Sequence, residues 1–317
     1  MANSFGALVG TFVLGVASVM CLPCAARAGA WTQPPGHLYA RLTFAGIDSR
    51  SRFDSEGEPI GLEEPNSTRR GTEYQSREIR SYGEYGLTEG FTIYGSLPLK
   101  RVRIVEPLAV STTLVQPELV HETTGFGDLS FGGRFRIRNA PGPVSIACEV
   151  KLPTGYATTD NPALGNGYVD ATLRGLIGAS AGWSYLTADL GWMHRWGAYQ
   201  DAVLYSFEVG GRILRDYRLR GVVRGVRSLG ESAGDPSGPI FDPALASPRS
   251  LSLEAVVGDE ITPGLLLEAG IHHVASGHNT LAGNTLEIGL AWSGSVRTGP
   301  SGPAPKRRGS GALRFRP

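Results

Sequence analysis

This 317-residue sequence contains few cysteines and few long apolar runs, and neither sign of charge is in clear excess. The 30 lysines and arginines offset 29 acidic residues, so the chain lacks the basic field that nucleic-acid binding requires. Beyond the N-terminus no apolar run approaches the roughly 18 residues of a membrane-spanning helix. Glycine is abundant, at 44 residues, but follows no fixed repeat, which excludes collagen. An all-β protein or an ordinary globular enzyme remains.

The N-terminus indicates export. No charged side chain occurs before Arg27, and most of the residues there are apolar. Ala26-Arg27-Ala28 fits the small-residue cleavage pattern, which predicts a signal peptide over residues 1–28. The basic segment that usually opens a signal peptide is missing, so an uncleaved N-terminal anchor is the alternative. Cleavage leaves Cys148 as the only cysteine, and the fold then forms without an intramolecular disulfide.

The remainder of the sequence repeats one local pattern. Segments of about ten residues alternate apolar and polar side chains, as the stretch from Val144 to Leu152 illustrates. A helix would scatter the charges around its circumference, whereas a pleated strand places them on one face. The pattern predicts twelve strands, near residues 38–46, 74–87, 91–103, 124–138, 143–153, 168–179, 184–196, 203–213, 218–228, 250–258, 264–274 and 284–292.

The connections between these strands alternate in length. Short turns fall at residues 88–90, 139–142, 180–183, 214–217 and 259–263. Longer loops fall at residues 47–73, 104–123, 154–167, 197–202, 229–249 and 275–283. An even number of strands with tight turns at one end and long loops at the other is typical of outer-membrane barrels, whereas a soluble sandwich does not sort its turns so regularly. We therefore predict an all-β fold, an antiparallel up-and-down transmembrane β-barrel of about 12 strands over residues 29–292, in the outer membrane of a Gram-negative cell.

The alternation also assigns the two faces of each strand. Lipid-facing side chains have to be apolar, and a closed barrel pairs every backbone group, so the charged set faces the lumen. By parity, the candidate lumen-lining residues are the bases Arg41, Arg80, Lys100, Arg134, Arg136, Lys151, Arg174, Arg212, Arg220 and Arg224. The matching acids are Glu78, Glu84, Asp128, Glu149, Asp170, Asp189, Glu208, Glu254, Glu268 and Glu287.

Ten bases against ten acids argue against a pore that is selective for one sign of charge. Twelve strands also lie between the eight of a barrel filled by side chains and the sixteen of a water-filled porin. A narrow, polar, salt-bridged lumen is expected. It suits a passive channel for small molecules, and it equally suits a closed, structural barrel.

The strand ends and two of the loops carry further signals. Residues 104–115 are largely apolar, so either the flanking strands extend past the membrane and pair there, or the loop folds inward or offers an access site for apolar solutes. The loop after residue 47 is acidic and indicates a solvated extracellular segment. Aromatic residues near strand ends suit the two membrane interfaces, namely Tyr85, Phe91, Trp183, Tyr185, Trp192, Tyr205 and Trp292.

Catalytic chemistry finds little support. His272, His273, Ser276 and His278 lie close together in sequence, but parity sends the first two to opposite faces of one strand. No GxSxG or HExxH motif and no cysteine-rich metal spacing occurs. We predict no enzyme activity, no cofactor and no metal site, with an outer-membrane lipid hydrolase as a third hypothesis.

Five segments resemble one known family. They begin at Gly29 (Gly-Ala-Trp-Thr-Gln-Pro), Tyr85 (Tyr-Gly-Leu-Thr-Glu-Gly-Phe), Thr124 (Thr-Gly-Phe-Gly-Asp-Leu), Lys151 (Lys-Leu-Pro-Thr-Gly-Tyr) and Asn279 (Asn-Thr-Leu-Ala-Gly-Asn). There the chain is similar to the proteobacterial outer-membrane barrels grouped as MetA-pathway phenol-degradation or transporter-like proteins. The resemblance spans about residues 29–292, implies uptake of small, often hydrophobic or aromatic compounds, and supplies no catalytic or binding residues.

The C-terminal end departs from that family. Such barrels usually end on an aromatic residue that the barrel-assembly machinery reads, whereas here Trp292 is followed by residues 293–317. That segment is rich in glycine, proline and basic residues without an acid, which predicts a disordered periplasmic tail. The expected partners are outer-membrane lipid and lipopolysaccharide, the barrel-assembly machinery and a small-molecule solute, with no nucleic acid.

Overall fold

The computed structural model describes residues 29–62, 71–107, 118–157, 159–197, 199–214, 217–230 and 249–296. Within these ranges the regular elements are strands: β1 (His37–Ser49), β2 (Ser51–Phe53), β3 (Pro59–Gly61), β4 (Glu73–Thr88), β5 (Phe91–Pro107), β6 (Glu118–Phe126), β7 (Leu129–Arg138), β8 (Val144–Leu152), β9 (Asp170–Ala181), β10 (Ser184–Arg195), β11 (Ala202–Arg212), β12 (Tyr217–Ser228), β13 (Arg249–Thr262), β14 (Leu265–His278), β15 (Thr280–Leu281) and β16 (Asn284–Ser295). No helix in the described part of the chain is long and apolar enough to cross a membrane.

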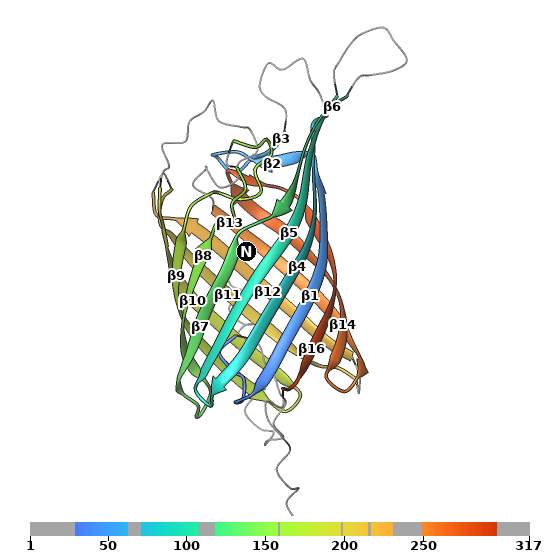
Figure 1. The fold of residues 1–317 in the computed structure, drawn as a ribbon. Coiled ribbons are helices and arrows are strands. Elements are labelled where there is room, and N and C mark those ends of the chain that lie inside the picture. The colour runs from blue at the N-terminus through green and yellow to red at the C-terminus, as the bar shows by residue number, and fades with distance from the viewer. Residues whose placement is uncertain are drawn as a thin grey trace, which may run out of the picture.

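The long strands close into one antiparallel barrel (Figure 1). Each long strand pairs with the next long strand along the chain, except that β6 and β7 both pair with β5, and β1 closes the ring between β4 on one side and β16 on the other. If β6 and β7 are counted as one interrupted strand, the barrel has 12 strands. The predicted fold class is confirmed, and every predicted strand but one recurs within a few residues of its expected bounds.

The exception is the strand expected over residues 124–138, which divides into β6 and β7. Pro98 of β5 lies opposite the division, and the pairing changes register by one residue between Leu99↔Phe126 and Ser96↔Ser130. Proline has no N–H to donate to a ladder, and Gly127 instead donates its own N–H to the Pro98 carbonyl at 2.9 Å. Above the division β6 pairs with β5 alone among the described strands.

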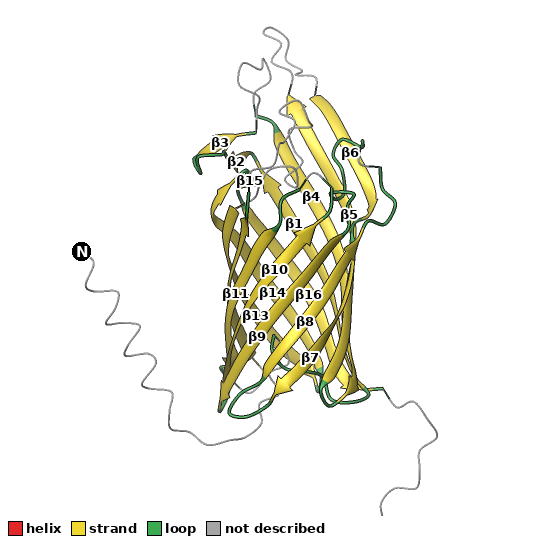
Figure 2. Cartoon of the chain, turned by 90° about the vertical axis from the view of Figure 1, so that its left-hand side faces the viewer, coloured by secondary structure: helices red, strands yellow, loops and turns green. Residues whose placement is uncertain are grey.

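The two ends of the barrel differ as the loop lengths predicted (Figure 2). Tight turns join β4 to β5 and β9 to β10 at the end where β1 begins and β16 ends, and β16 runs three residues past Trp292 to Ser295. The opposite end carries the longer connections and a small sheet of β15, β2 and β3. There β5 and β6 stay paired as far as Pro107↔Glu118, so the flanking strands do extend as the first of the two interpretations proposed.

Some sequence predictions fall beyond these ranges. The signal peptide of residues 1–28, the tail from residue 297, the acidic-loop residues 63–70 and the apolar residues 108–117 lie outside the described residues.

The outer face of the barrel is apolar and the inner face is polar, the reverse of a soluble protein. Leu190 and Leu286 are each 63% exposed, and Phe135 is 57% exposed. Arg134 and Glu254, by contrast, are only 5% and 8% exposed. A contiguous exposed band of aliphatic and aromatic side chains suits contact with acyl chains, so the barrel is of the transmembrane type.

Candidate functional site: a divided lumen

Most of the predicted charged residues meet one another inside the barrel. Several of them form ion pairs with short N···O distances. These pairs are Arg134 with Glu84 (2.7 Å), Arg41 with Glu268 (2.7 Å) and with Glu287 (3.0 Å), Lys151 with Asp170 (2.7 Å) and with Asp128 (3.1 Å), Arg174 with Asp189 (2.8 Å), Arg80 with Glu78 (2.5 Å), and Arg220 and Arg224 with Glu254. Lys100 approaches Glu78 at 3.9 Å, and Arg212 approaches Glu260, which the sequence analysis did not include, at 3.6 Å. Glu208 accepts a hydrogen bond from Tyr185, while Arg136 and Glu149 form no ion pair within the described ranges.

A feature that the sequence analysis missed is the segment of residues 29–36, which lies inside the barrel before β1. Arg134 holds it, because its guanidinium donates to the carbonyl oxygens of Gly29 and Trp31, each at 2.6 Å, and to Glu84 at 2.7 Å. The side chains of Arg134 and Glu84 are 6% and 5% exposed. A buried ion pair whose arginine also donates to backbone carbonyls is well suited to hold a segment that does not pair with a strand of the barrel.

Further contacts spread this segment over the wall formed by β4, β5, β7 and β8. Ser145 donates to the Ala30 carbonyl at 2.6 Å, and the Gln33 side-chain amide donates to Glu84 at 2.8 Å. Ala30 and Gln33 are 0% and 1% exposed. At Trp31 the segment also reaches β9 and β10, where this side chain lies beside Gly178 and Tyr185, so the segment occupies part of the lumen at the short-turn end.

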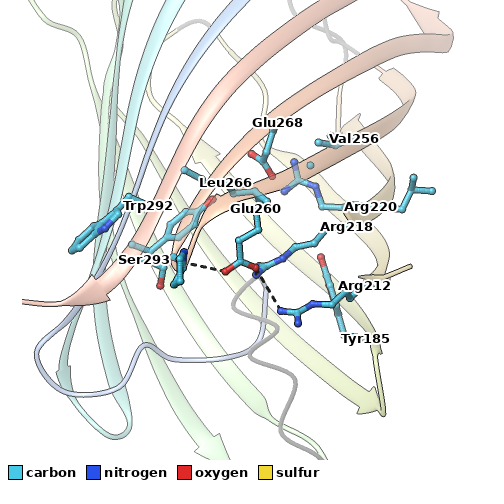
Figure 3. A pocket seen from close by; sticks show the side chains of 17 residues that line it. Tyr185, Arg212, Arg218, Arg220, Val256, Glu260, Leu266, Glu268, Trp292 and Ser293 are labelled. Carbon is cyan, nitrogen blue, oxygen red and sulfur yellow. Dashed lines mark hydrogen bonds and ion pairs between the residues drawn. The ribbon is translucent and has the colours of Figure 1, made fainter. Parts of the chain in front are cut away.

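Next to this segment, at the same end of the lumen, lies a pocket of about 510 Å³ (Figure 3). Its walls come from β10 to β14, β16 and β1. Charged, aromatic and aliphatic side chains share the lining, chiefly Tyr39, Tyr185, Arg212, Arg218, Arg220, Val256, Glu260, Leu266, Glu268 and Ala291.

Tyr185 lies where the N-terminal segment meets the pocket, which corrects its assignment to an interfacial girdle. Its hydroxyl donates to Glu208 at 2.6 Å, and its ring meets the edge of Trp31 with centroids 6.1 Å apart. Tyr185 lies four residues before Asp189 on β10, and an even separation along a strand puts both side chains on the same face, so parity was the signal that identified its face.

At the long-loop end, residues 153–157 and 159–169 fold against lumen-facing charges. Lys151 binds the side chain of Asn166 as well as Asp170, and Lys100 donates to the Leu164 carbonyl at 3.3 Å. Tyr156 in this loop donates to Asp128. Burial and the neighbouring carboxylate together raise the pKa of the Tyr156 hydroxyl above its usual value. The lumen is thus narrowed by a loop at one end and by the N-terminal segment at the other.

The structure does not assemble the residues of the hydrolase hypothesis. His273 contacts Asn284 at 2.8 Å on the outer face, while His278 lies beside the turn at Gly57. A register shift in the β13–β14 ladder lies next to Ser276. In the described part of the chain no hydrogen bond joins Ser276 to a histidine, and no group of three His, Cys, Asp or Glu residues could hold a metal ion.

Comparison with known proteins supports the fold. No protein-family model matches the sequence, and no curated protein matches it. The structure is similar to the COG4313 outer membrane channel from Pseudomonas putida F1, with a TM-score of 0.61 at 12% identity, covering 87% of this chain and 100% of that one. The toluene transporter TbuX of Ralstonia pickettii gives a TM-score of 0.43 at 9% identity, covering 84% of this chain and 90% of that one. The first of these likenesses shows that the chain shares the barrel fold of an outer-membrane channel.

Proposed function

We propose that the protein is a passive channel, or facilitator, for small solutes across the outer membrane, including hydrophobic and aromatic ones. The observation that carries this proposal is the pocket of about 510 Å³ inside a closed barrel, next to the N-terminal segment that lies in the same end of the lumen. A volume of this order accommodates a small organic molecule rather than a polymer. The family resemblance of the sequence and the channel with the same fold support the same proposal.

The described charges suit facilitated diffusion of small solutes rather than ion selection. Most of the bases and acids in the lumen are paired with one another, as the pairs of Arg41 with Glu268 and of Arg174 with Asp189 illustrate. A solute that enters the lumen exchanges water for polar side chains and aromatic edges, and the lumen as a whole carries no large excess of charge of one sign. We further propose export through the signal peptide of residues 1–28, and lipid and lipopolysaccharide as the surroundings of the barrel.

The pocket can be tested by filling it. Ala291 lines the pocket and is 2% exposed, so Ala291→Trp should obstruct the path. Ala269 on the neighbouring strand β14 is exposed on the outer face, so Ala269→Trp is the matched control. We expect the refolded wild type to pass a small current in planar bilayers, Ala291→Trp to lower it at least several-fold, and Ala269→Trp to leave it unchanged.

Val256→Phe narrows the same pocket with a smaller change of volume and replaces Ala291→Trp if that variant does not fold. Folding is checked by the shift in electrophoretic mobility between heated and unheated samples. A folded wild-type barrel that passes no current would overturn the proposal in favour of a closed, structural barrel.

A further inference from the structure

We propose that the pocket at the short-turn end binds small carboxylates that carry an aromatic or aliphatic body, and that Arg212 and Arg218 hold the carboxylate. The inference rests on the proposed channel function and names the class of solute for which the pocket is built. It is carried by a pair of arginines that share a single acid among the described residues, in a pocket whose remaining walls are largely aromatic and aliphatic.

The two arginines face each other across the ladder. Arg212 of β11 and Arg218 of β12 are directly paired residues, an arrangement in which like charges repel. They share one acid, because Glu260 lies 2.6 Å from Arg218 and 3.6 Å from Arg212 (Figure 3). The other oxygen of Glu260 accepts the N–H of Gly264 at 3.2 Å. One carboxylate with both oxygens engaged cannot neutralise two guanidinium groups.

Other arginines of the same lumen are compensated differently. Arg41 has two acids within 3.0 Å, and its side chain is 17% exposed. The side chains of Arg212 and Arg218 are 46% and 40% exposed, and they open toward the pocket. The Arg212 side chain makes no hydrogen bond to any of the described residues. The N–H groups of its planar guanidinium can therefore bind a carboxylate.

The rest of the pocket suits a compact organic body. Tyr39 and Tyr185 contribute rings, and Val256, Leu266 and Ala291 contribute aliphatic surface. The Tyr185 hydroxyl is already bonded to Glu208, so this residue offers its ring rather than its donor. A benzoate-sized anion would place its carboxylate between the two guanidinium groups and its ring against this surface, gaining from both charge and apolar contact.

The test compares three solutes on the wild-type channel in planar bilayers. Benzoate carries both the charge and the ring, acetate carries only the charge, and benzyl alcohol carries only the ring. We expect benzoate to interrupt the current at concentrations at least tenfold lower than either of the others, because only benzoate uses both parts of the pocket. The double variant Arg212→Gln, Arg218→Gln should raise the blocking concentration of benzoate about tenfold or more and leave that of benzyl alcohol within about twofold.

A matched control comes from the other end of the same strand. Arg227 of β12 and Arg249 of β13 are also directly paired and exposed, so Arg227→Gln, Arg249→Gln removes the same net charge far from the pocket. This control should leave the block by benzoate unchanged. A benzoate block that matches that of acetate, or that weakens equally in both double variants, overturns the binding site while the channel function stands. Loss of all current in the wild type removes the channel function instead.

Discussion

At the scale of single residues, Gly86 is what allows the N-terminal segment to approach β4. A Cβ atom at this position would lie 2.0 Å from the Pro34 carbonyl oxygen and 2.6 Å from that of Gln33. Both neighbours are backbone atoms, so neither can rotate away as a side chain would. The segment and the strand are therefore compatible only with glycine at this position.

Gly86→Ala should displace the N-terminal segment without disrupting the barrel. We expect a current several-fold larger than that of the wild type, because the part of the lumen that the segment occupies would open. Gly83→Ala on the same strand is the control, since a Cβ there would meet only the Tyr39 carbonyl at an ordinary 3.8 Å. An unchanged current in Gly86→Ala, with the variant folded, would mean that residues 29–36 do not limit passage.

The buried ion pair of Arg134 and Glu84 also acts at the scale of single residues, because each side chain neutralises the charge of the other. Arg134→Met leaves the buried Glu84 carboxylate without the positive charge that neutralises it and should destabilise the protein by roughly 3–5 kcal/mol. The double variant Arg134→Met, Glu84→Met removes both charges and should recover part of that loss. Urea unfolding in lipid vesicles measures the free energy of unfolding of each variant. Arg80→Met is the control, because the Arg80 side chain is 52% exposed, and its loss should lower the stability by under about 1 kcal/mol.

At the scale of elements, the strands were predictable and the segments inside the barrel were not. The alternation from Val144 to Leu152 predicts a strand because one face meets lipid and the other meets charge. Residues 29–36 show no such alternation, and the groups that anchor them are mostly backbone carbonyls, which every residue possesses. The division of the strand at Gly127 was missed because its cause, Pro98, lies on the neighbouring strand.

The loop of residues 153–169 is a further element whose position depends on a few charges. Lys151 reaches Asp128, Asp170 and Asn166, so Lys151→Met should release the loop. We expect chymotrypsin to cleave the released loop at Tyr156 several-fold faster than in the wild type. Arg174→Met, which breaks a pair on the adjacent strand, should leave the cleavage rate unchanged.

The same loop should also respond to alkaline pH. Its Tyr156 has a pKa raised by burial and by the hydrogen bond to Asp128, so folding favours the protonated phenol. The stabilisation is complete below about pH 10, the value for an unfolded tyrosine, and is lost as the pH rises toward the higher folded pKa. Ultraviolet absorbance of tyrosinate should show one fewer late-titrating group in Tyr156→Phe than in the wild type. Identical titration curves above pH 10 would contradict the assignment.

At the scale of the whole molecule, the inverted distribution of polarity defines which solvent each face requires. A closed barrel leaves no unpaired edge in its ring of strands, and many of its lumen charges are paired, so the exposed apolar band is the surface that requires lipid. This explains why strand positions could be derived from alternation while the path through the lumen could not. Lipid constrains every outward residue in the same manner, whereas the lumen is shaped by individual contacts such as those of Arg134.

The lipid-facing band provides a test of the whole arrangement. Leu190 lies near the middle of β10, opposite Tyr205, and is 63% exposed. Leu190→Arg should destabilise the barrel in lipid vesicles by about 2–4 kcal/mol, the cost of an arginine near the bilayer midplane, while Leu190→Phe should change little. Folding titrations in urea followed by mobility on unheated gels measure both. If Leu190→Arg folds as stably as Leu190→Phe, then this face is solvated, and the barrel does not span a bilayer with this face toward lipid.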